Sequence, residues 1–167
     1  MSEAISCSPN LRLYYQSEVS FGFYMTVIKR SAEVPFTPAQ MYTLVNEVEK
    51  YPEFLPWCES STVHSRGEDE VRATLCLAKG KLRKSFTTHN RMQTDKMVEV
   101  KLVSGPFKHL EGFWRFEALP NNRCRVSLDL EFEFVNRLLS IAIGPLFNQV
   151  ANTLVDNFVK RAQDLYT

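Results

Sequence analysis

The chain has 167 residues, of which 44% are hydrophobic, 12% aromatic and 23% charged. This is the composition of one folded domain, and it excludes disordered, collagen-like and coiled-coil proteins. Twenty basic and nineteen acidic residues leave a net charge of +1. This chain lacks the large positive charge that is typical of nucleic-acid-binding proteins, so contact with DNA is not expected.

The cysteines carry no sign of a disulfide framework or a metal centre. They stand far apart along the chain, without the short Cys and His spacings of zinc sites, at positions Cys7, Cys58, Cys76 and Cys124. A reduced compartment and no metal are therefore predicted. The most apolar run, 138–147, is shorter than the roughly 20 residues of a membrane-spanning helix.

The first 24 residues differ from the rest of the chain. They lack both the basic start and the unbroken apolar core of a signal peptide. We expect 1–24 to be a disordered extension or a mis-assigned start, with translation beginning at Met25. Residues 25–167 are then expected to form a single domain.

The first elements of that domain are a strand and a helix. Residues 25–34 alternate in the manner of a strand. Thr37 and Gln40 form a capping box around Pro38, which predicts a helix that ends near Lys50. The following segment, 51–58, holds two prolines and three aromatic residues, so a single turn and a bend are expected there.

A meander of strand-like segments follows, separated by turn signals that include Gly80, Gly105 and Pro120–Asn122. The segments are expected at 58–65, 71–79, 81–92, 97–103, 107–118 and 123–134. In the last of them, apolar and polar residues alternate strictly from Val126 to Phe134, which predicts one buried and one solvated face.

Helical periodicity returns at 136–165. Gly144–Pro145 is expected to end a short first helix and to begin a second of about 20 residues, whose apolar stripe needs an apolar partner. The sheet is the available partner. The sequence therefore predicts an α+β fold, in which a curved antiparallel sheet wraps around a long C-terminal helix.

Known catalytic patterns are absent from the sequence, including HExxH, GxSxG and phosphate-binding glycine loops. The histidines His64, His89 and His109 fall on separate predicted strands and are interpreted as surface residues. Cys58 stands beside Trp57 and is interpreted as a small buried hydrophobe. A cyclase-like or dehydrase-like enzyme needs an acid–base group, for which His89 is the best candidate, and this hypothesis ranks last.

A curved sheet that closes on a helix can enclose a cavity lined by inward side chains. Periodicity does not separate such a cavity from a filled core, and a filled core is the simpler interpretation. The inward candidates are Leu75, Leu77, Phe86, Val100, Leu102, Trp114, Phe116, Leu128 and Leu130 from the strands, with Leu146, Phe147, Val150 and Leu154 from the terminal helix.

Four cations bracket one predicted hairpin turn: Lys79, Lys81, Arg83 and Lys84. Acidic lipid headgroups and RNA phosphates are both suitable partners for such a cluster. A hairpin that is basic only for solubility fits the pattern equally well.

Two segments carry a resemblance to a known family. These are 35–46, Pro-Phe-Thr-Pro-Ala-Gln-Met-Tyr-Thr-Leu-Val-Asn, and the more specific 51–58, Tyr-Pro-Glu-Phe-Leu-Pro-Trp-Cys. Supporting blocks stand at 105–110 and 132–134, with Trp114 and Phe116 between them. Over about 26–166 the chain resembles the coenzyme-Q-binding branch of the START-like, polyketide-cyclase-related superfamily, and within it the bacterial ribosome-association toxins.

The resemblance implies a START-like helix-grip fold without catalysis. Its first functional implication is a carrier that holds the isoprenoid tail of ubiquinone, or a similar lipid, and supports respiration. Such a carrier would be cytoplasmic, with transient peripheral contact at the inner membrane surface. The matching positions place Phe54, Leu55, Pro56 and Trp57 at the mouth of the cavity, and Trp114 and Phe116 inside it.

The alternative implication is a toxin that binds the large ribosomal subunit and blocks its association with the small one. A small ubiquitin-like protein is then an expected partner. In this alternative, the basic hairpin at 79–84 is expected to touch ribosomal RNA phosphate. The ligand carrier is placed first and the ribosome-binding toxin second.

Overall fold

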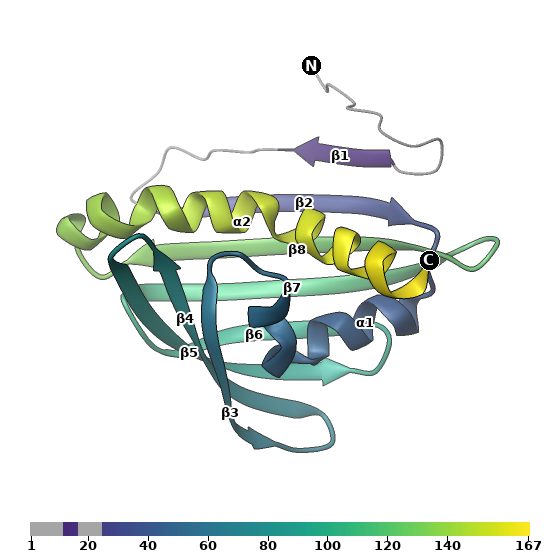
Figure 1. Cartoon of the computed structure of the whole chain (residues 1–167), viewed down its shortest axis with the longest axis horizontal. Coiled ribbons are helices and arrows are strands. Elements are labelled where there is room, and N and C mark those ends of the chain that lie inside the picture. Colours follow the sequence, from purple (N-terminus) through teal and green to yellow (C-terminus); the bar gives the residue numbers. More distant parts are fainter. Residues whose placement is uncertain (1–11, 17–24) are drawn as a thin grey trace.

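The computed structural model describes residues 12–16 and 25–167. Within these residues, eight strands form one antiparallel sheet in the order β1-β2-β8-β7-β6-β5-β4-β3 (Figure 1). The strands are β1 (Arg12–Gln16), β2 (Thr26–Val34), β3 (Cys58–Arg66), β4 (Glu70–Lys79), β5 (Leu82–Gln93), β6 (Met97–Ser104), β7 (Phe107–Leu119) and β8 (Arg123–Phe134). The helices are α1 (Pro38–Asn46), the 3₁₀ helix η1 (Val48–Glu53) and α2 (Arg137–Tyr166).

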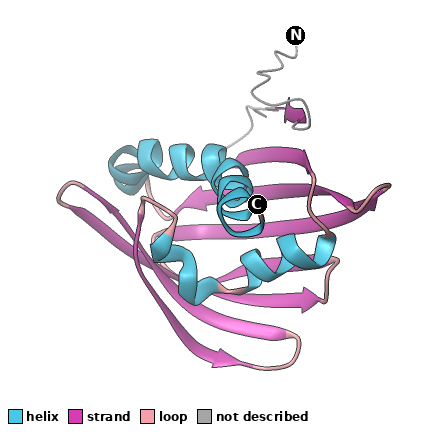
Figure 2. Ribbon diagram, turned by 45° about the vertical axis from the view of Figure 1, so that its right-hand side comes forward, coloured by secondary structure: helices cyan, strands magenta, loops and turns pink. Residues whose placement is uncertain are grey.

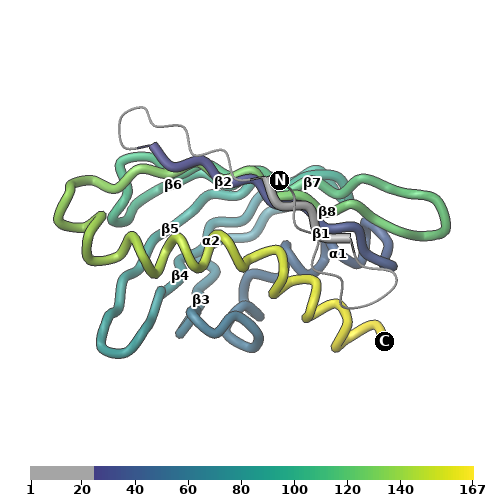
Figure 3. The backbone as a smooth tube through the Cα atoms, turned by 90° about the horizontal axis from the view of Figure 1, so that it is seen from above, coloured from purple at the N-terminus to yellow at the C-terminus, as the bar shows by residue number. Residues whose placement is uncertain are grey.

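The sheet curves, and α2 lies across its concave side (Figures 1 and 2). Seen from above, β2 and β6 to β8 lie on one side of α2, and β3 to β5 curve past it towards the other side (Figure 3). The face of α2 that meets the sheet is apolar, with Ile143, Phe147, Val150 and Phe158 all buried. The predicted α+β helix-grip fold is therefore confirmed, because the apolar stripe of α2 finds its partner in the inward residues of the strands.

The capping box predicted at the start of α1 is present. The Gln40 backbone amide donates to the Thr37 hydroxyl at 3.3 Å, and the Thr37 amide donates to Gln40 Oε1 at 2.9 Å. The helix ends at Asn46 instead of near Lys50, and the chain continues as the 3₁₀ helix η1. The buried Tyr51 hydroxyl donates to the Val45 carbonyl at 2.6 Å. This bond ties η1 to the last turn of α1, where helix carbonyls lack partners of their own.

The hairpin turns are built from residues that tolerate positive φ. Gly80 turns β4 into β5 at φ +59°, and Asn121 and Asn122 turn β7 into β8 at +64° and +55°. Two successive positive φ values match the twist of a hairpin turn. Strand β3 pairs irregularly with β4, with register shifts between Cys58 and Ser60 and between Val63 and Ser65.

Helix α2 corrects the expectation of two helices divided at Gly144–Pro145. It runs unbroken from Arg137 to Tyr166 with Pro145 inside it. Proline removes one hydrogen bond to the preceding turn, but the buried neighbours Ile143, Leu146 and Phe147 hold the backbone against the sheet. Among the described helices, α2 alone is both long enough and apolar enough to cross a membrane, by length and composition only. Because its apolar face is packed on the sheet, we interpret it as a core helix.

Most of the extension predicted at 1–24 lies outside the described residues. Within it, the structure describes Arg12–Gln16 as strand β1, which pairs with β2 from Arg12 opposite Glu33 to Gln16 opposite Lys29. The sequence did not predict this strand.

Candidate functional site

A cavity of about 80 Å³ lies between α2 and the concave side of the sheet. Its walls come from β4 to β8, from η1, from the bend before β3 and from α2. The lining residues are Val48, Tyr51, Trp57, Leu75, Phe86, Thr88, Asn90, Val100, Leu110, Gly112, Trp114, Leu128, Leu130, Phe147, Val150, Ala151, Leu154 and Phe158. Almost all of them are apolar, so the inner cavity suits a hydrophobic ligand.

Two polar side chains interrupt this apolar wall. Thr88 and Asn90 follow Phe86 at two-residue steps along β5, so all three share the inner face of the strand. Thr88 is 5% exposed and Asn90 is 7% exposed, and Asn90 Oδ1 has no hydrogen-bond partner. The inner cavity therefore contains an unpaired amide oxygen.

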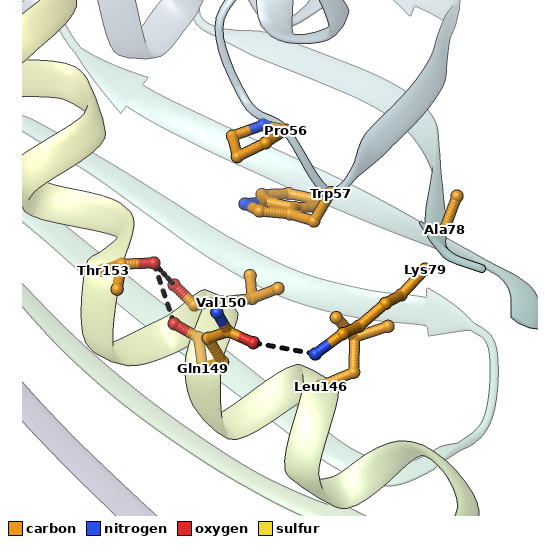
Figure 4. A pocket seen from close by; sticks show the side chains of 8 residues that line it. All are labelled: Pro56, Trp57, Ala78, Lys79, Leu146, Gln149, Val150 and Thr153. Atoms are coloured by element: carbon orange, nitrogen blue, oxygen red, sulfur yellow. Dashed lines mark hydrogen bonds between the residues drawn. The ribbon is translucent and has the colours of Figure 1, made fainter.

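A second, outer pocket of about 220 Å³ adjoins the inner cavity and shares Trp57 and Val150 with it. Its remaining lining residues are Pro56, Ala78, Lys79, Leu146, Gln149 and Thr153. In Figure 4 the indole ring of Trp57 lies between Pro56 and the α2 residues, and Lys79 Nζ donates to Gln149 Oε1 at 3.3 Å. The indole N–H of Trp57 is buried and has no partner. Trp57 thus separates an apolar interior from a more polar entrance.

The structure gathers many of the predicted cavity residues in these two spaces. The inner cavity is lined by Trp57, Leu75, Phe86, Val100, Trp114, Leu128, Leu130, Phe147, Val150 and Leu154, and the outer pocket by Pro56 and Leu146. Their inward orientation agrees with the strand and helix periodicity, while ligand binding by these residues stays a prediction.

Five predicted residues lie elsewhere. Leu55 and Leu77 are fully buried in the core, and Phe116 packs edge-on against Tyr42 with ring centroids 5.9 Å apart. Phe54 packs against Phe158 at 5.1 Å, and Leu102 is half-buried beside the core. These five side chains line neither pocket.

Sequence reasoning missed Thr88 and Asn90 as wall residues. A signal was present, since both stand in phase with the inward Phe86 and Met92 on β5. Polar residues at two consecutive inward positions are unusual for a plain core. Tyr51 and Phe158 were missed because their positions depend on how η1 and α2 pack together, which no local pattern specifies.

The predicted basic hairpin is partly neutralised. Arg83 Nε forms an ion pair with Glu59 at 2.8 Å, and Lys79 is held by Gln149. Lys81 and Lys84 are exposed and form no ion pair within the described residues. These two ammonium groups have no side-chain partner in the described part of the chain, whereas the ammonium group of Lys79 keeps its charge and is hydrogen-bonded to the neutral amide of Gln149.

Few groups near the cavity are titratable. Tyr51 is the only ionisable residue among the described lining residues of the inner cavity, and burial raises its pKa. His89 instead bonds Glu70 at 3.0 Å on the outer side of the sheet. Burial also raises the pKa of the Cys58 thiol to about 12, which keeps it protonated and unreactive at neutral pH.

Among the described residues, one side-chain group outside the cavity has ligand atoms close enough for a metal ion. It consists of His109, Glu111 and Glu131, whose donor atoms lie within 4.8 Å of one another. Lys101 Nζ already approaches Glu111 at 3.7 Å, and Glu131 is exposed. We assign no metal to this group.

The start of α2 exposes large apolar side chains. Leu138 is 76% exposed and Ile141 is 66% exposed, next to the exposed Val135. Val135 and Ile141 line a surface pocket of about 650 Å³ that also contains Phe134 and Arg137, and Leu138 follows Arg137 in the chain. The transient membrane contact expected from the sequence stays a prediction, and these are the side chains that suit it.

Comparison with known proteins shows strong similarity to bacterial toxins. The chain is 45% identical over 141 residues to the ribosome association toxin RatA of Pseudomonas aeruginosa, covering 84% of this chain and 98% of that protein. It is 38% identical to RatA of Escherichia coli K12, covering 86% and 90%. The mitochondrial coenzyme Q-binding protein COQ10 of Drosophila melanogaster is 25% identical, covering 78% and 55%.

Solved structures have the same fold. An 18 kDa protein from Caulobacter crescentus is 31% identical with a TM-score of 0.65, covering 86% of this chain and 99% of that one. A protein from Thermus thermophilus reaches a TM-score of 0.72 at 17% identity, covering 84% and 99%, and this likeness shows the fold alone. Residues 34–159 match a family described as polyketide cyclase/dehydrase and lipid transport. The chain therefore belongs to the polyketide cyclase/dehydrase and lipid transport family, with a START-like fold.

Proposed function

We propose that this protein is a ribosome-association factor of the RatA type, which binds the large ribosomal subunit and blocks its joining to the small subunit. The observation that carries the proposal is the 45% identity to a ribosome association toxin along 98% of that protein's length. From the sequence alone, the quinone carrier stood first. The 25% identity to a coenzyme Q-binding protein is much lower, so the ribosome-binding alternative now takes first place.

The hairpin between β4 and β5 is the proposed contact with ribosomal RNA. Lys81 and Lys84 have no ion pair within the described chain, so their charges are available to phosphate groups. Arg83 is held by Glu59 and contributes less free charge. A cytoplasmic location follows from this proposal, because ribosomal subunits join there.

The test is sedimentation of ribosomes through a sucrose gradient after addition of the protein. Wild-type protein is expected to increase the free-subunit peaks, and the double variant Lys81→Glu/Lys84→Glu is expected to lose most of this effect. Lys96→Glu/Lys160→Glu is the matched control, since it makes the same charge change on exposed lysines away from the hairpin. Wild-type protein without effect overturns the proposed function, and an active Lys81/Lys84 variant overturns only the contact surface.

The inner cavity supports a second candidate function, the binding of a hydrophobic ligand such as an isoprenoid quinone or another lipid. The supporting observation is its nearly continuous apolar wall and its shared boundary with the outer pocket at Trp57 and Val150. A volume of about 80 Å³ holds a few water molecules, so a longer ligand must also occupy the outer pocket and displace side chains.

Ligand binding without catalysis is the form of this second function that we propose. Acid–base catalysis needs a group that exchanges protons at the working pH. Tyr51 is the only ionisable residue among the described lining residues, its pKa is raised, and its hydroxyl is engaged with Val45. Native mass spectrometry of the protein from its own host, followed by organic extraction, tests the proposal. A near-stoichiometric quinone or lipid supports it, and protein that stays empty when incubated with quinone-containing vesicles contradicts it.

A further inference from the structure

The feature of the inner cavity that says most about a ligand is the pair of polar side chains on β5, Thr88 and Asn90. Asn90 is 7% exposed, and its Oδ1 atom has no hydrogen-bond partner. The hydroxyl-bearing Thr88, 5% exposed, is its neighbour on the inner face of β5. A buried polar atom without a partner costs about 1–3 kcal/mol, so such a group in a folded protein calls for an explanation.

We propose that Asn90 and Thr88 hold the polar end of a neutral amphiphile, which enters the inner cavity with that end first. The inference rests on the hydrophobic-ligand function proposed above and adds the chemical class and the orientation of the ligand. The ligand carries a hydroxyl or carbonyl group at one end of an apolar chain. The side-chain amide of Asn90 can both donate to such a group and accept from it.

The walls exclude the other ligand classes. A wholly apolar ligand would fill the cavity and leave the Asn90 amide without a partner in a dry environment. A carboxylate, phosphate or ammonium end would be buried without a counter-charge, because no charged side chain is among the described lining residues. A neutral hydrogen-bonding end meets both conditions.

The position of Asn90 along β5 sets the orientation. Asn90 stands four residues beyond Phe86, or about 13 Å further from the β4–β5 hairpin. The outer pocket lies at the hairpin end, where Ala78 and Lys79 line it. The polar end therefore occupies the interior, and the apolar chain leads past Trp57 and Val150 towards the outer pocket.

The protein carries its own reporters for this site. The chain has two tryptophans, Trp57 and Trp114, and both line the inner cavity. Their fluorescence is therefore expected to change when the cavity is filled. The probes are 1-dodecanol and 1-chlorododecane, which have the same chain and differ in whether the end group forms strong hydrogen bonds.

Wild-type protein is expected to bind 1-dodecanol about tenfold more tightly than 1-chlorododecane. This is the change in affinity expected when the alcohol supplies a hydrogen bond to one buried polar group that otherwise has no partner. In Asn90→Leu this preference is expected to disappear while 1-chlorododecane still binds. Gln93→Leu, an exposed position on the same strand, is the matched control and is expected to keep the wild-type preference. Thr88→Val provides a second variant of conserved shape, with an expected loss of about fivefold in 1-dodecanol affinity.

The outcomes separate the two proposals. If wild-type protein binds both probes equally, the orientation and the role of Asn90 are overturned while ligand binding stands. If the preference survives in both Asn90→Leu and Thr88→Val, the polar end lies elsewhere and the inference is also overturned. If neither probe changes the tryptophan fluorescence and neither is retained in native mass spectra, ligand binding itself fails together with the inference.

Discussion

Gly105 lies against Phe86 so closely that a Cβ atom on Gly105 would be 2.6 Å from the Cβ atom of Phe86. Gly105 also has φ +148°, a conformation that residues with a side chain rarely adopt. Phe86 in turn packs edge-on against Phe107 at 5.8 Å and lines the inner cavity. The turn between β6 and β7 thus restricts the position of Phe86, which forms part of the cavity wall.

Replacement of Gly105 by Ala is expected to lower the free energy of unfolding by about 1–3 kcal/mol, because the new methyl group forces both the backbone and Phe86 to move. Urea denaturation measures the change. Gly67→Ala is the control, since the nearest atom to its Cβ belongs to the flexible Glu70 side chain at 3.2 Å and the expected change is below about 0.5 kcal/mol. Equal effects of the two substitutions would contradict the close approach.

Gly112 offers a way to fill the inner cavity from the sheet side. A Cβ atom there would meet Leu130 Cδ1 at 3.2 Å, and both residues line the cavity. Because Leu130 can turn into the empty space, Gly112→Ala is expected to raise the free energy of unfolding by about 0.5–1 kcal/mol. It is expected to weaken the binding of 1-dodecanol severalfold, measured by tryptophan fluorescence. A destabilised Gly112→Ala variant with unchanged affinity would show that the cavity cannot absorb the displaced side chain.

The hydrogen bond from the Tyr51 hydroxyl to the Val45 carbonyl is expected to hold η1 in place beneath the cavity. Tyr51→Phe keeps the ring contact with Phe158 at 5.3 Å but removes the donor, so a loss of about 1–3 kcal/mol in unfolding free energy is expected. Tyr166→Phe is the matched control, because its hydroxyl bonds Gln40 at 3.3 Å at the exposed end of α2. A smaller loss in Tyr51→Phe than in Tyr166→Phe would contradict this role.

The stability of the sheet is expected to depend on pH through Glu33. Hydrogen bonds from Arg125 at 2.8 Å and from Arg123 at 3.1 Å hold the pKa of this carboxyl below its usual value. A lowered pKa stabilises the fold above the unfolded-state value, near 4.5, and this contribution is lost as the pH falls through the folded-state value. Glu33→Gln is therefore expected to cost about 0.5–1 kcal/mol at pH 7 and to approach the wild-type stability at acidic pH.

Thermal or urea unfolding at several pH values measures this difference. Glu117→Gln is the control, because Glu117 is 61% exposed and, among the described residues, forms an ion pair with Arg125 alone, so its effect is expected to be smaller. A difference between wild type and Glu33→Gln that grows towards low pH would have the wrong sign for the ion pair.

The sequence was sufficient to predict the elements whose signals are local. The capping box of Thr37 and Gln40 and the alternation from Val126 to Phe134 each report a neighbouring backbone conformation, and the structure has the α1 helix and the β8 strand at those places. The same locality explains the error at Pro145. Proline disfavours a helix interior, but the packing of Ile143 and Phe147 on the sheet outweighs that preference and comes from distant residues.

The candidate site was less predictable for a related reason. Whether an inward side chain lines a cavity or fills the core depends on its neighbours across the sheet. Leu77 and Phe86 look equivalent in the pattern, yet Leu77 is fully buried in the core and Phe86 lines the cavity. Asn90 shows what the pattern did contain, since an amide in phase with the inward Phe86 and Met92 indicates a polar position from the sequence alone.

The irregular pairing of β3 has a consequence for how the protein behaves when concentrated. A regular terminal strand would offer a row of free amides on which other molecules could polymerise. In the described sheet, β3 interrupts its register twice and ends at Arg66, while the opposite terminal strand, β1, has five residues. Bulges and short terminal strands both discourage such stacking. In the described sheet, both terminal strands are therefore poor templates for fibril growth.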